Sequence, residues 1–397
     1  MVTLSSRLDR VIESQTLAMT KKARELKEQG NDVISLSIGE PDFDTPINIC
    51  NEATAAMSRG ETHYPPVLGT MAFRQAIQRK LLIENGLDYS VSQIIVSNGA
   101  KQSLFNAIMA LVNPGDEVII PAPYWVSYPS MVNYAQGKVV EIASSVEENY
   151  LCSAEKLESA ITDKTKLIIF SSPCNPSGSV IPKALLDQWV EVLQRHPHVF
   201  VISDEIYERI VYNEKPVSIA SYPGMKDRVA VVNGLAKGFA MTGWRIGYLA
   251  GPQELVSACE RFQGMVSSGA NSIAQAAGIE ALKGDQSQVE MMRITFEKRR
   301  NLMHQELSKI NGIKLGNPEG AFYHFPDVSY YFGKKDGETT LNNADEICLY
   351  LLERALVALV SGAAFGAPNC IRLSYATSEE NIVEACSRIK KALESLN

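Results

Sequence analysis

The stretch RVAVVNGLAKGFAMTGWRIG, residues 228–247, joins a short apolar run to a loop of small residues that contains one lysine. The run at 228–233 is short and β-branched, which is typical of a buried strand. The loop holds Lys237 and, eight residues later, Arg245. Small neighbours leave room for a ligand, and a nearby cation lowers the proton affinity of a partly desolvated amine. The stretch therefore predicts a strand that delivers a reactive lysine to a ligand site.

Four further apolar runs precede this one, and a polar loop follows each of them. Helical patterns separate the runs, and this alternation predicts βαβ units and a mostly parallel sheet. Because the runs are apolar throughout, we expect helices on both faces of the sheet. Ligands bind at the carboxyl ends of the strands in such sheets, so the loops should converge on one site. The four runs are residues 93–97, 117–121, 166–171 and 199–203.

Helical signals flank this core on both sides. A helix is expected over residues 13–30, and Thr377 to Glu380 form a capping-box pattern that opens an amphipathic helix running towards Leu396. The polar stretch at 334–343 is expected to be an exposed loop. A chain of 397 residues accommodates two domains.

Composition disfavours several classes of protein, among them nucleic-acid-binding, disulfide-rich and membrane proteins. The net charge is −7 and no basic run occurs, so the sequence gives no sign of a positively charged surface that would bind nucleic acid. The seven cysteines form no CxxC pair, which favours a reducing compartment and a cytoplasmic location over a disulfide or zinc framework. The first residues lack the apolar core of a signal peptide, and we expect no membrane span. His196 and His198 flank a proline without a neighbouring acid or cysteine, so no metal site is assigned.

The lysine loop carries a family resemblance. Ala236 and Lys237, followed by MTGWRIG at 241–247, resemble the cofactor-lysine signature of class I aminotransferases, the fold type I pyridoxal-phosphate enzymes. A lone lysine in a glycine-rich turn is more often a surface residue, but this longer match is specific. The resemblance implies that Lys237 holds pyridoxal 5′-phosphate as a Schiff base and moves the reacting proton, while Arg245 grips the phosphate. Ala236 and Gly234 stand where many members have serine.

The resemblance extends from about residue 8 to the end of the chain and implies an α/β architecture. A large cofactor-binding domain is expected over residues 46–285, with a mostly parallel seven-stranded sheet sandwiched by helices. A smaller α+β domain, built from both termini, is expected over 286–397. An N-terminal arm and helix at 1–45 would join the smaller domain.

A shared active site is also implied. His63-Tyr64-Pro65-Pro66, with Gly69 after it, resembles a segment whose tyrosine crosses a dimer interface to the phosphate of the neighbouring subunit. If Tyr64 does so here, the protein is a homodimer with two shared sites.

The remaining loops supply further cofactor contacts in the family. Gly99, Ala100 and Lys101 match its phosphate-binding tripeptide at a helix N-terminus, although a simple strand-to-helix turn would look the same. Asp204 and Tyr207 in DEIYE match the acid beside the pyridine nitrogen and the phenol that bonds the ring oxygen O3′. In isolation, Asp204 would more often be a helix cap.

Two loop residues match both cofactor and substrate contacts. Asn175, in SSPCNPSG at 171–178, resembles the asparagine that donates to O3′, and an Asn-Pro turn is the alternative. Trp125 matches the aromatic that stacks on the ring, and simple core packing is the alternative.

Substrate recognition is expected from an arginine, because a planar guanidinium binds a carboxylate through two hydrogen bonds. Arg372, in the apolar run CIRLSYA, matches the family's carboxylate-binding arginine, and an edge-strand arginine paired with a glutamate is the alternative. Gly39 resembles part of a segment that closes over substrate. The second arginine of animal-type aspartate aminotransferases is absent from 267–275. SNGAKQ and PYWVSY instead resemble a bacterial and plant subgroup, in which residues equivalent to Lys101 and Thr16 bind an acidic side chain.

The predicted reaction is a ping-pong transamination between aspartate or glutamate and a 2-oxo acid, either 2-oxoglutarate or oxaloacetate. An alternative within the subgroup is transamination of prephenate to arogenate, alone or as a second activity. Elimination or lyase chemistry on the same cofactor also stays open. A nicotinamide oxidoreductase is disfavoured because no GxGxxG follows the first strand. A DNA-binding regulator is disfavoured because no recognition-helix charge pattern precedes the core.

Overall fold

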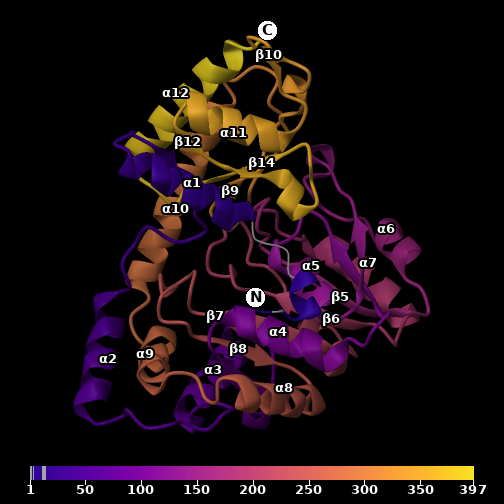
Figure 1. Cartoon of the computed structure of the whole chain (residues 1–397). Coiled ribbons are helices and arrows are strands. Elements are labelled where there is room, and N and C mark those ends of the chain that lie inside the picture. The colour runs from indigo at the N-terminus through magenta and orange to yellow at the C-terminus, as the bar shows by residue number, and fades with distance from the viewer. Residues whose placement is uncertain (1, 3, 11–14) are drawn as a thin grey trace.

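The computed structural model describes residues 2, 4–10 and 15–397. Its central element is a seven-stranded sheet in the order β2-β8-β7-β6-β5-β3-β4 (Figure 1). β8 runs antiparallel to both neighbours, and the other six strands run parallel to one another. The strands are β2 (Ile94–Ser97), β3 (Glu117–Pro121), β4 (Lys138–Ile142), β5 (Thr165–Ser171), β6 (Phe200–Asp204), β7 (Val229–Gly234) and β8 (Gly247–Ala250). All five strands predicted from apolar runs are confirmed, and β4 and β8 are additions to them.

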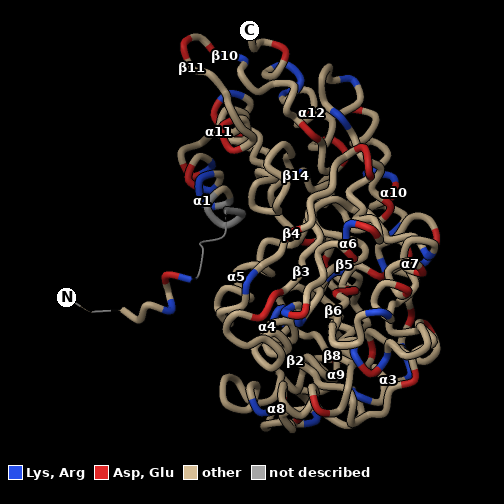
Figure 2. The backbone as a smooth tube through the Cα atoms, turned by 90° about the vertical axis from the view of Figure 1, so that its right-hand side faces the viewer, with Lys and Arg blue, Asp and Glu red and all other residues tan. Residues whose placement is uncertain are grey.

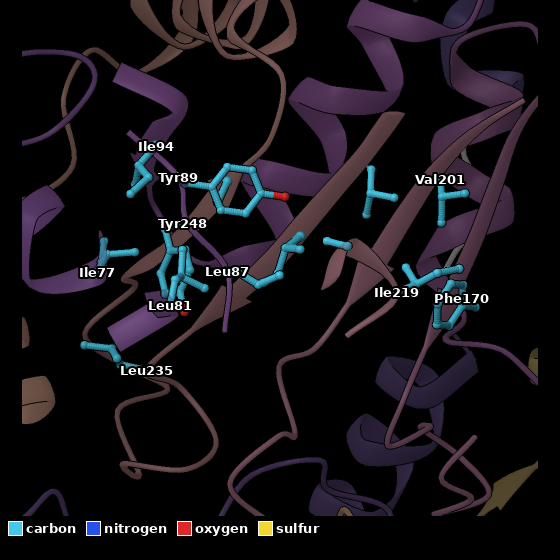
Figure 3. Packing of buried hydrophobic residues seen from close by; sticks show 14 of the residues in the cluster. Ile77, Leu81, Leu87, Tyr89, Ile94, Phe170, Val201, Ile219, Leu235 and Tyr248 are labelled. Atoms are coloured by element: carbon cyan, nitrogen blue, oxygen red, sulfur yellow. The ribbon is translucent and has the colours of Figure 1, made fainter. Parts of the chain in front are cut away.

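Helices cover both faces of this sheet, as predicted. Successive residues of one strand enter different cores: Ile168 and Phe170 of β5 belong to one hydrophobic cluster, and Leu167 and Ile169 belong to another. The first cluster includes residues of α3 (Met71–Asn85), α7 (Lys183–Arg195) and α9 (Ser272–Lys283), and Figure 3 shows part of it. The second includes residues of α4 (Ala100–Leu111), α5 (Ser127–Tyr134) and α8 (Gln253–Val266). Both faces of the sheet are therefore buried, and the loops that follow its strands lie at its edge.

A smaller sheet lies beyond the carboxyl ends of the large one (Figure 1). It has the order β13-β14-β9, with β9 at Tyr323–His324, β13 at Val360–Ser361 and β14 at Ile371–Ser374. β1 (Ile34–Ser35) pairs in parallel with β12 (Val357–Ala358), so segments from the two ends of the chain meet here. The remaining helices are α1 (Gln15–Glu28), α2 (Ile47–Ser58), α6 (Ala154–Ala160), α10 (Ser287–Leu307), α11 (Ala344–Arg354) and α12 (Glu379–Glu394).

α10 links the two halves of the fold. Val289 and Met292 in its first half pack into a core of the large sheet, whereas Phe296 and Met303 pack into the core around the small sheet. Phe43, which precedes the large sheet in sequence, stacks edge-on against Phe296 with ring centroids 5.3 Å apart. One continuous helix therefore packs into the cores of both halves.

Two local predictions need correction. The polar stretch expected as a loop forms a hairpin of β10 (Lys335–Asp336) and β11 (Thr339–Thr340), because its glycine at position 337 has a positive φ and allows a tight turn. The last helix is capped by Ser378, whose hydroxyl accepts from the backbone N–H of Asn381, and not by Thr377. In the described part of the chain, no helix combines the length and apolar character of a membrane span. Figure 2 shows basic and acidic residues interspersed along the backbone.

Candidate active site

A cavity of about 380 Å³ lies at the carboxyl ends of the strands, between the two sheets. The predicted convergence of the polar loops is therefore observed. All but two of the residues singled out from the sequence line this cavity: Gly39, Gly99, Ala100, Lys101, Trp125, Asn175, Asp204, Tyr207, Lys237, Arg245 and Arg372.

The two exceptions are Tyr64 and Thr16. Tyr64 lies between α2 and α3 with 95 % of its side chain exposed, away from the cavity of its own chain. Thr16 is in α1, but its side chain falls outside the described part of the structure. Neither residue contributes to the geometry below.

Lys237 occupies the centre of the site, three residues after β7 ends. Its Nζ donates a hydrogen bond to the carbonyl oxygen of Gly39 and lies 5.8 Å from the ring centroid of Tyr207. Burial, and secondarily the positive charge of Arg372, lower the pKa of this lysine to about 8. More of this amine is therefore deprotonated near neutral pH than of an ordinary lysine, and the deprotonated form is the one that attacks a carbonyl carbon.

Asp204 ends β6 and is 5 % exposed. Its Oδ2 accepts a hydrogen bond from the hydroxyl of Tyr128 at 2.7 Å, and its Oδ1 accepts from the backbone N–H of Ile206 at 3.2 Å. Turns, and not an α-helix, follow it, so Asp204 is not a helix cap. Burial raises its pKa to about 6 and outweighs these two hydrogen bonds and the charge of Lys237, which lower it. No cation among the described residues forms an ion pair with Asp204. A positively charged ligand atom in the cavity would supply the missing charge.

The hydrogen bond from Tyr128 was not predicted from the sequence. Tyr128 is fully buried in α5, and its ring packs edge-on against Trp125 at 5.5 Å. An aromatic residue on the apolar face of a helix looks like core packing, and only its hydroxyl contact across 76 residues reveals another role. Its position three residues after Trp125, at the start of α5, is the one signal that the sequence offers.

We expect Tyr128→Phe to raise the pKa of Asp204 further above about 6, because the charged form loses a hydrogen-bond donor while burial is unchanged. A hydrogen bond to a charged group contributes about 1.5–3 kcal/mol, so kcat should fall roughly tenfold to a hundredfold. The acid limb of the pH–rate profile measures the shift. Tyr134→Phe, on the same helix and outside the cavity, is the control. An unchanged acid limb would rule out this role of Tyr128.

The opposite end of the cavity is built for an anion. Gly99 precedes α4 with φ +83°, and a Cβ there would lie 2.5 Å from Nη2 of Arg245. A Cβ on Gly247 would lie 2.4 Å from the backbone nitrogen of Ala100. The two glycines therefore let β8 and Arg245 approach the first turn of α4. Free N–H groups of a helix N-terminus beside a guanidinium form a phosphate-binding arrangement.

Positions 234 and 236, on either side of Leu235, differ in the space they offer. A Cβ on Gly234 would meet the carbonyl oxygen of Ile246 and the Cα of Gly247, both at 3.0 Å. A side chain at position 234 would therefore push against the backbone of the neighbouring strand. Ala236, by contrast, lines the cavity. Lys101 also lies here, with its Nζ 4.8 Å over the ring of Trp125.

Arg372 enters the cavity from the small sheet. It is 3 % exposed and lies on β14, the central strand of that sheet, so it is not an edge-strand residue. Its Nη1 donates to Oδ1 of Asn175 at 2.9 Å and its Nη2 donates to the carbonyl oxygen of Ser37 at 2.7 Å. Its Nε has no partner, and no carboxylate of the described residues pairs with it. A buried guanidinium without an acid is costly unless a ligand supplies the negative charge.

Comparison with known proteins places the chain among enzymes. Residues 31–389 match the model of the family described as aminotransferase class I and II. A bifunctional aspartate aminotransferase and glutamate/aspartate-prephenate aminotransferase of Petunia hybrida is 48% identical over 99% of this chain and 83% of its own length. An aspartate/prephenate aminotransferase of Cereibacter sphaeroides is 47% identical over 98% of both chains.

Solved structures agree with the sequence relatives. The aspartate aminotransferase of Rhizobium meliloti superposes with a TM-score of 0.97 at 43% identity over 100% of both chains. The aspartate aminotransferase of Thermus thermophilus with maleate gives 0.93 at 40% identity, over 99% of this chain and 100% of the other. The α/β fold with its large mixed sheet, the convergence of the motif loops and these matches lead to one conclusion: the chain belongs to the class I and II aminotransferases and has the fold type I architecture.

Proposed function

We propose that the protein transfers the amino group of an acidic L-amino acid, aspartate or glutamate, to a 2-oxo acid, with pyridoxal 5′-phosphate as cofactor. The observation that carries this proposal is a single cavity that brings together an unpaired buried acid, an unpaired buried guanidinium and an amine of lowered pKa: Asp204, Arg372 and Lys237. The printed names of the Petunia and Cereibacter relatives support the choice of aspartate.

The residues of the cavity fit the cofactor group by group. Arg245 and the N–H groups at the start of α4, from Gly99 to Lys101, would hold the phosphate. Asp204 would hold the protonated ring nitrogen, whose positive charge would pair with the carboxylate of Asp204. Asn175 and Tyr207 would contact the ring oxygen O3′, Trp125 would cover the ring face, and Lys237 would hold the aldehyde carbon. The cofactor itself supplies an acceptor for the electrons released when the substrate Cα loses its proton.

The protein's own groups then bind, orient and move a proton. Arg372 binds the α-carboxylate of the substrate through its guanidinium, with Asn175 fixing the plane of that group. The backbone of Gly39 borders the same space. Lys237, whose pKa is lowered to about 8, would take the proton from the substrate Cα and would deliver it to the carbon that comes from the cofactor aldehyde. Burial of the site limits access of water to the reacting atoms.

The second substrate carboxylate needs another cation. We propose Lys101, which lines the cavity, with Thr16 as a neighbour from α1. Prephenate is a second candidate acceptor, because both the Petunia and the Cereibacter relatives carry prephenate in their names.

Assembly and location complete the proposal. A homodimer in which Tyr64 reaches the neighbouring subunit's phosphate would explain why a large aromatic residue is 95 % exposed. A cytoplasmic location is proposed from the free cysteines. We also propose the domain limits 1–45, 46–285 and 286–397.

A half-reaction tests the function. Holoenzyme mixed with aspartate alone should convert its cofactor absorption to that of the aminated form and release oxaloacetate without ammonia. A panel of amino donors against 2-oxoglutarate, oxaloacetate and prephenate then ranks the substrates. Stoichiometric ammonia would favour elimination instead, and absence of turnover with every acidic donor would reject the substrate class.

A further inference from the structure

Tyr323, on β9, lies behind the cavity and is not among the residues that line it. Its side chain is completely buried. Its hydroxyl lies 2.8 Å from the hydroxyl of Tyr207, and its ring centroid lies 4.6 Å from the guanidinium carbon of Arg372. One side chain therefore contacts two residues that line the same cavity, one in the turn after β6 of the large sheet and one on β14 of the small sheet.

We infer that Tyr323 is a positioning residue that holds Tyr207 and Arg372 in their working orientations at the same time. The inference rests on the proposed function, because it assigns Tyr323 a role through two residues proposed to contact the cofactor and the substrate. It is separate from that function, since Tyr323 touches neither ligand in the proposal.

The hydroxyl pair has a defined direction in the loaded site. A phenol has one proton to donate, so Tyr207 cannot donate both to Tyr323 and to a ligand oxygen in the cavity. Tyr323 must then donate to Tyr207. This donation polarises the Tyr207 hydroxyl and strengthens the bond that it makes towards the cavity. Gly39 makes room for the arrangement, because a Cβ there would lie 2.9 Å from the Tyr323 hydroxyl oxygen.

The ring of Tyr323 acts on Arg372. The guanidinium carbon lies 4.6 Å from the ring centroid of Tyr323 and 5.0 Å from that of Phe365, and the group pairs with no carboxylate of the described residues. A cation over an aromatic face is stabilised by the ring quadrupole without loss of its N–H donors. Tyr323 thus keeps a desolvated cation in place and leaves its negative partner to be supplied by the substrate.

Tyr323→Phe isolates the hydroxyl. Removing it should raise the pKa at which the absorption of the bound cofactor changes by about 0.3–1 unit, because Tyr207 becomes a weaker donor. Binding of maleate, a dicarboxylate without an amino group, should change less than about twofold, because the ring stays. The matched control is Tyr375→Phe, since Tyr375 belongs to another buried hydroxyl pair, 3.1 Å from Tyr212, away from the cavity.

Tyr323→Leu removes the ring as well. The dissociation constant of maleate should rise about tenfold, whereas Tyr375→Leu should leave it within about twofold. An absorption titration of Tyr323→Phe that matches Tyr375→Phe overturns the hydroxyl half of the inference. Maleate binding that is equal in the two leucine variants overturns the Arg372 half. If Tyr323→Leu does not fold, the absorption titration of Tyr323→Phe still tests the role of the Tyr323 hydroxyl. A wild-type protein that shows no cofactor band would instead reject the proposed function.

Discussion

Lys237→Ala is expected to lower kcat by roughly 10⁴-fold, the upper end of what a positioned acid–base group contributes. The loss has two physical sources. The amine lies at the centre of the cavity, where it would link covalently to the cofactor aldehyde, and its pKa of about 8 suits it to exchange a proton at neutral pH. The arginine and helix N-terminus at the phosphate end are unaffected, so the variant should still bind the cofactor without a covalent link.

Single-turnover absorbance with aspartate measures this loss, and borohydride reduction followed by peptide mapping locates the link. Lys237→Arg is the matched control, because it keeps a positive charge at the same place but cannot form an imine. We expect it to be as inactive as the alanine variant. Recovery of more than a few per cent of activity with arginine would mean that the charge, and not the nucleophile, matters at this position.

Arg372→Met is expected to lower kcat/KM for acidic donors by about 10²–10⁴-fold, the cost of removing one member of a buried charge pair. The unusual feature is the expected stability. Arg372 has no carboxylate partner among the described residues, so an apolar side chain of similar length removes a buried charge that the unliganded fold stabilises poorly. The thermal midpoint should therefore change little although activity collapses.

Arg372→Lys supplies the control for charge. Lysine restores the positive charge but not the planar pair of donors, so it should recover a minor part of kcat/KM. Steady-state kinetics and a thermal melt on the same preparations give both readouts. A large drop in the melting midpoint of Arg372→Met together with the loss of activity would show that the guanidinium is structural and would contradict the proposed role.

Much of the fold could be predicted because buried parallel strands leave an unambiguous pattern. Each of the five predicted strands is apolar on both faces, and helices do cover both faces in the structure. β4 was missed because it is an edge strand in which Lys138 and Glu141 are exposed and interrupt the apolar run. β8 was missed because its four residues follow the lysine loop directly and carry no turn signal of their own.

The residues of the candidate site also fall into those that could be predicted from the sequence and those that could not. The site residues on loops after strands could be predicted, because packing of the core gives no reason for polar side chains at those positions. Tyr128 and Tyr323 were not found, because each lies in a regular element where an aromatic residue simply resembles core. Their roles depend on hydroxyl contacts to residues 76 and 116 positions away, and nothing in a local pattern encodes such pairs.

α10 has one further consequence. Because the same helix supplies Val289 and Met292 to one core and Phe296 and Met303 to the other, neither half can lose its packing without disturbing its neighbour. The chain should accordingly melt as one cooperative unit, and a molecule that occupies the crevice should protect the far ends of both halves against hydrogen exchange. Any rotation of one half over the other would have to bend this helix between Met292 and Phe296, where its packing passes from one core to the other.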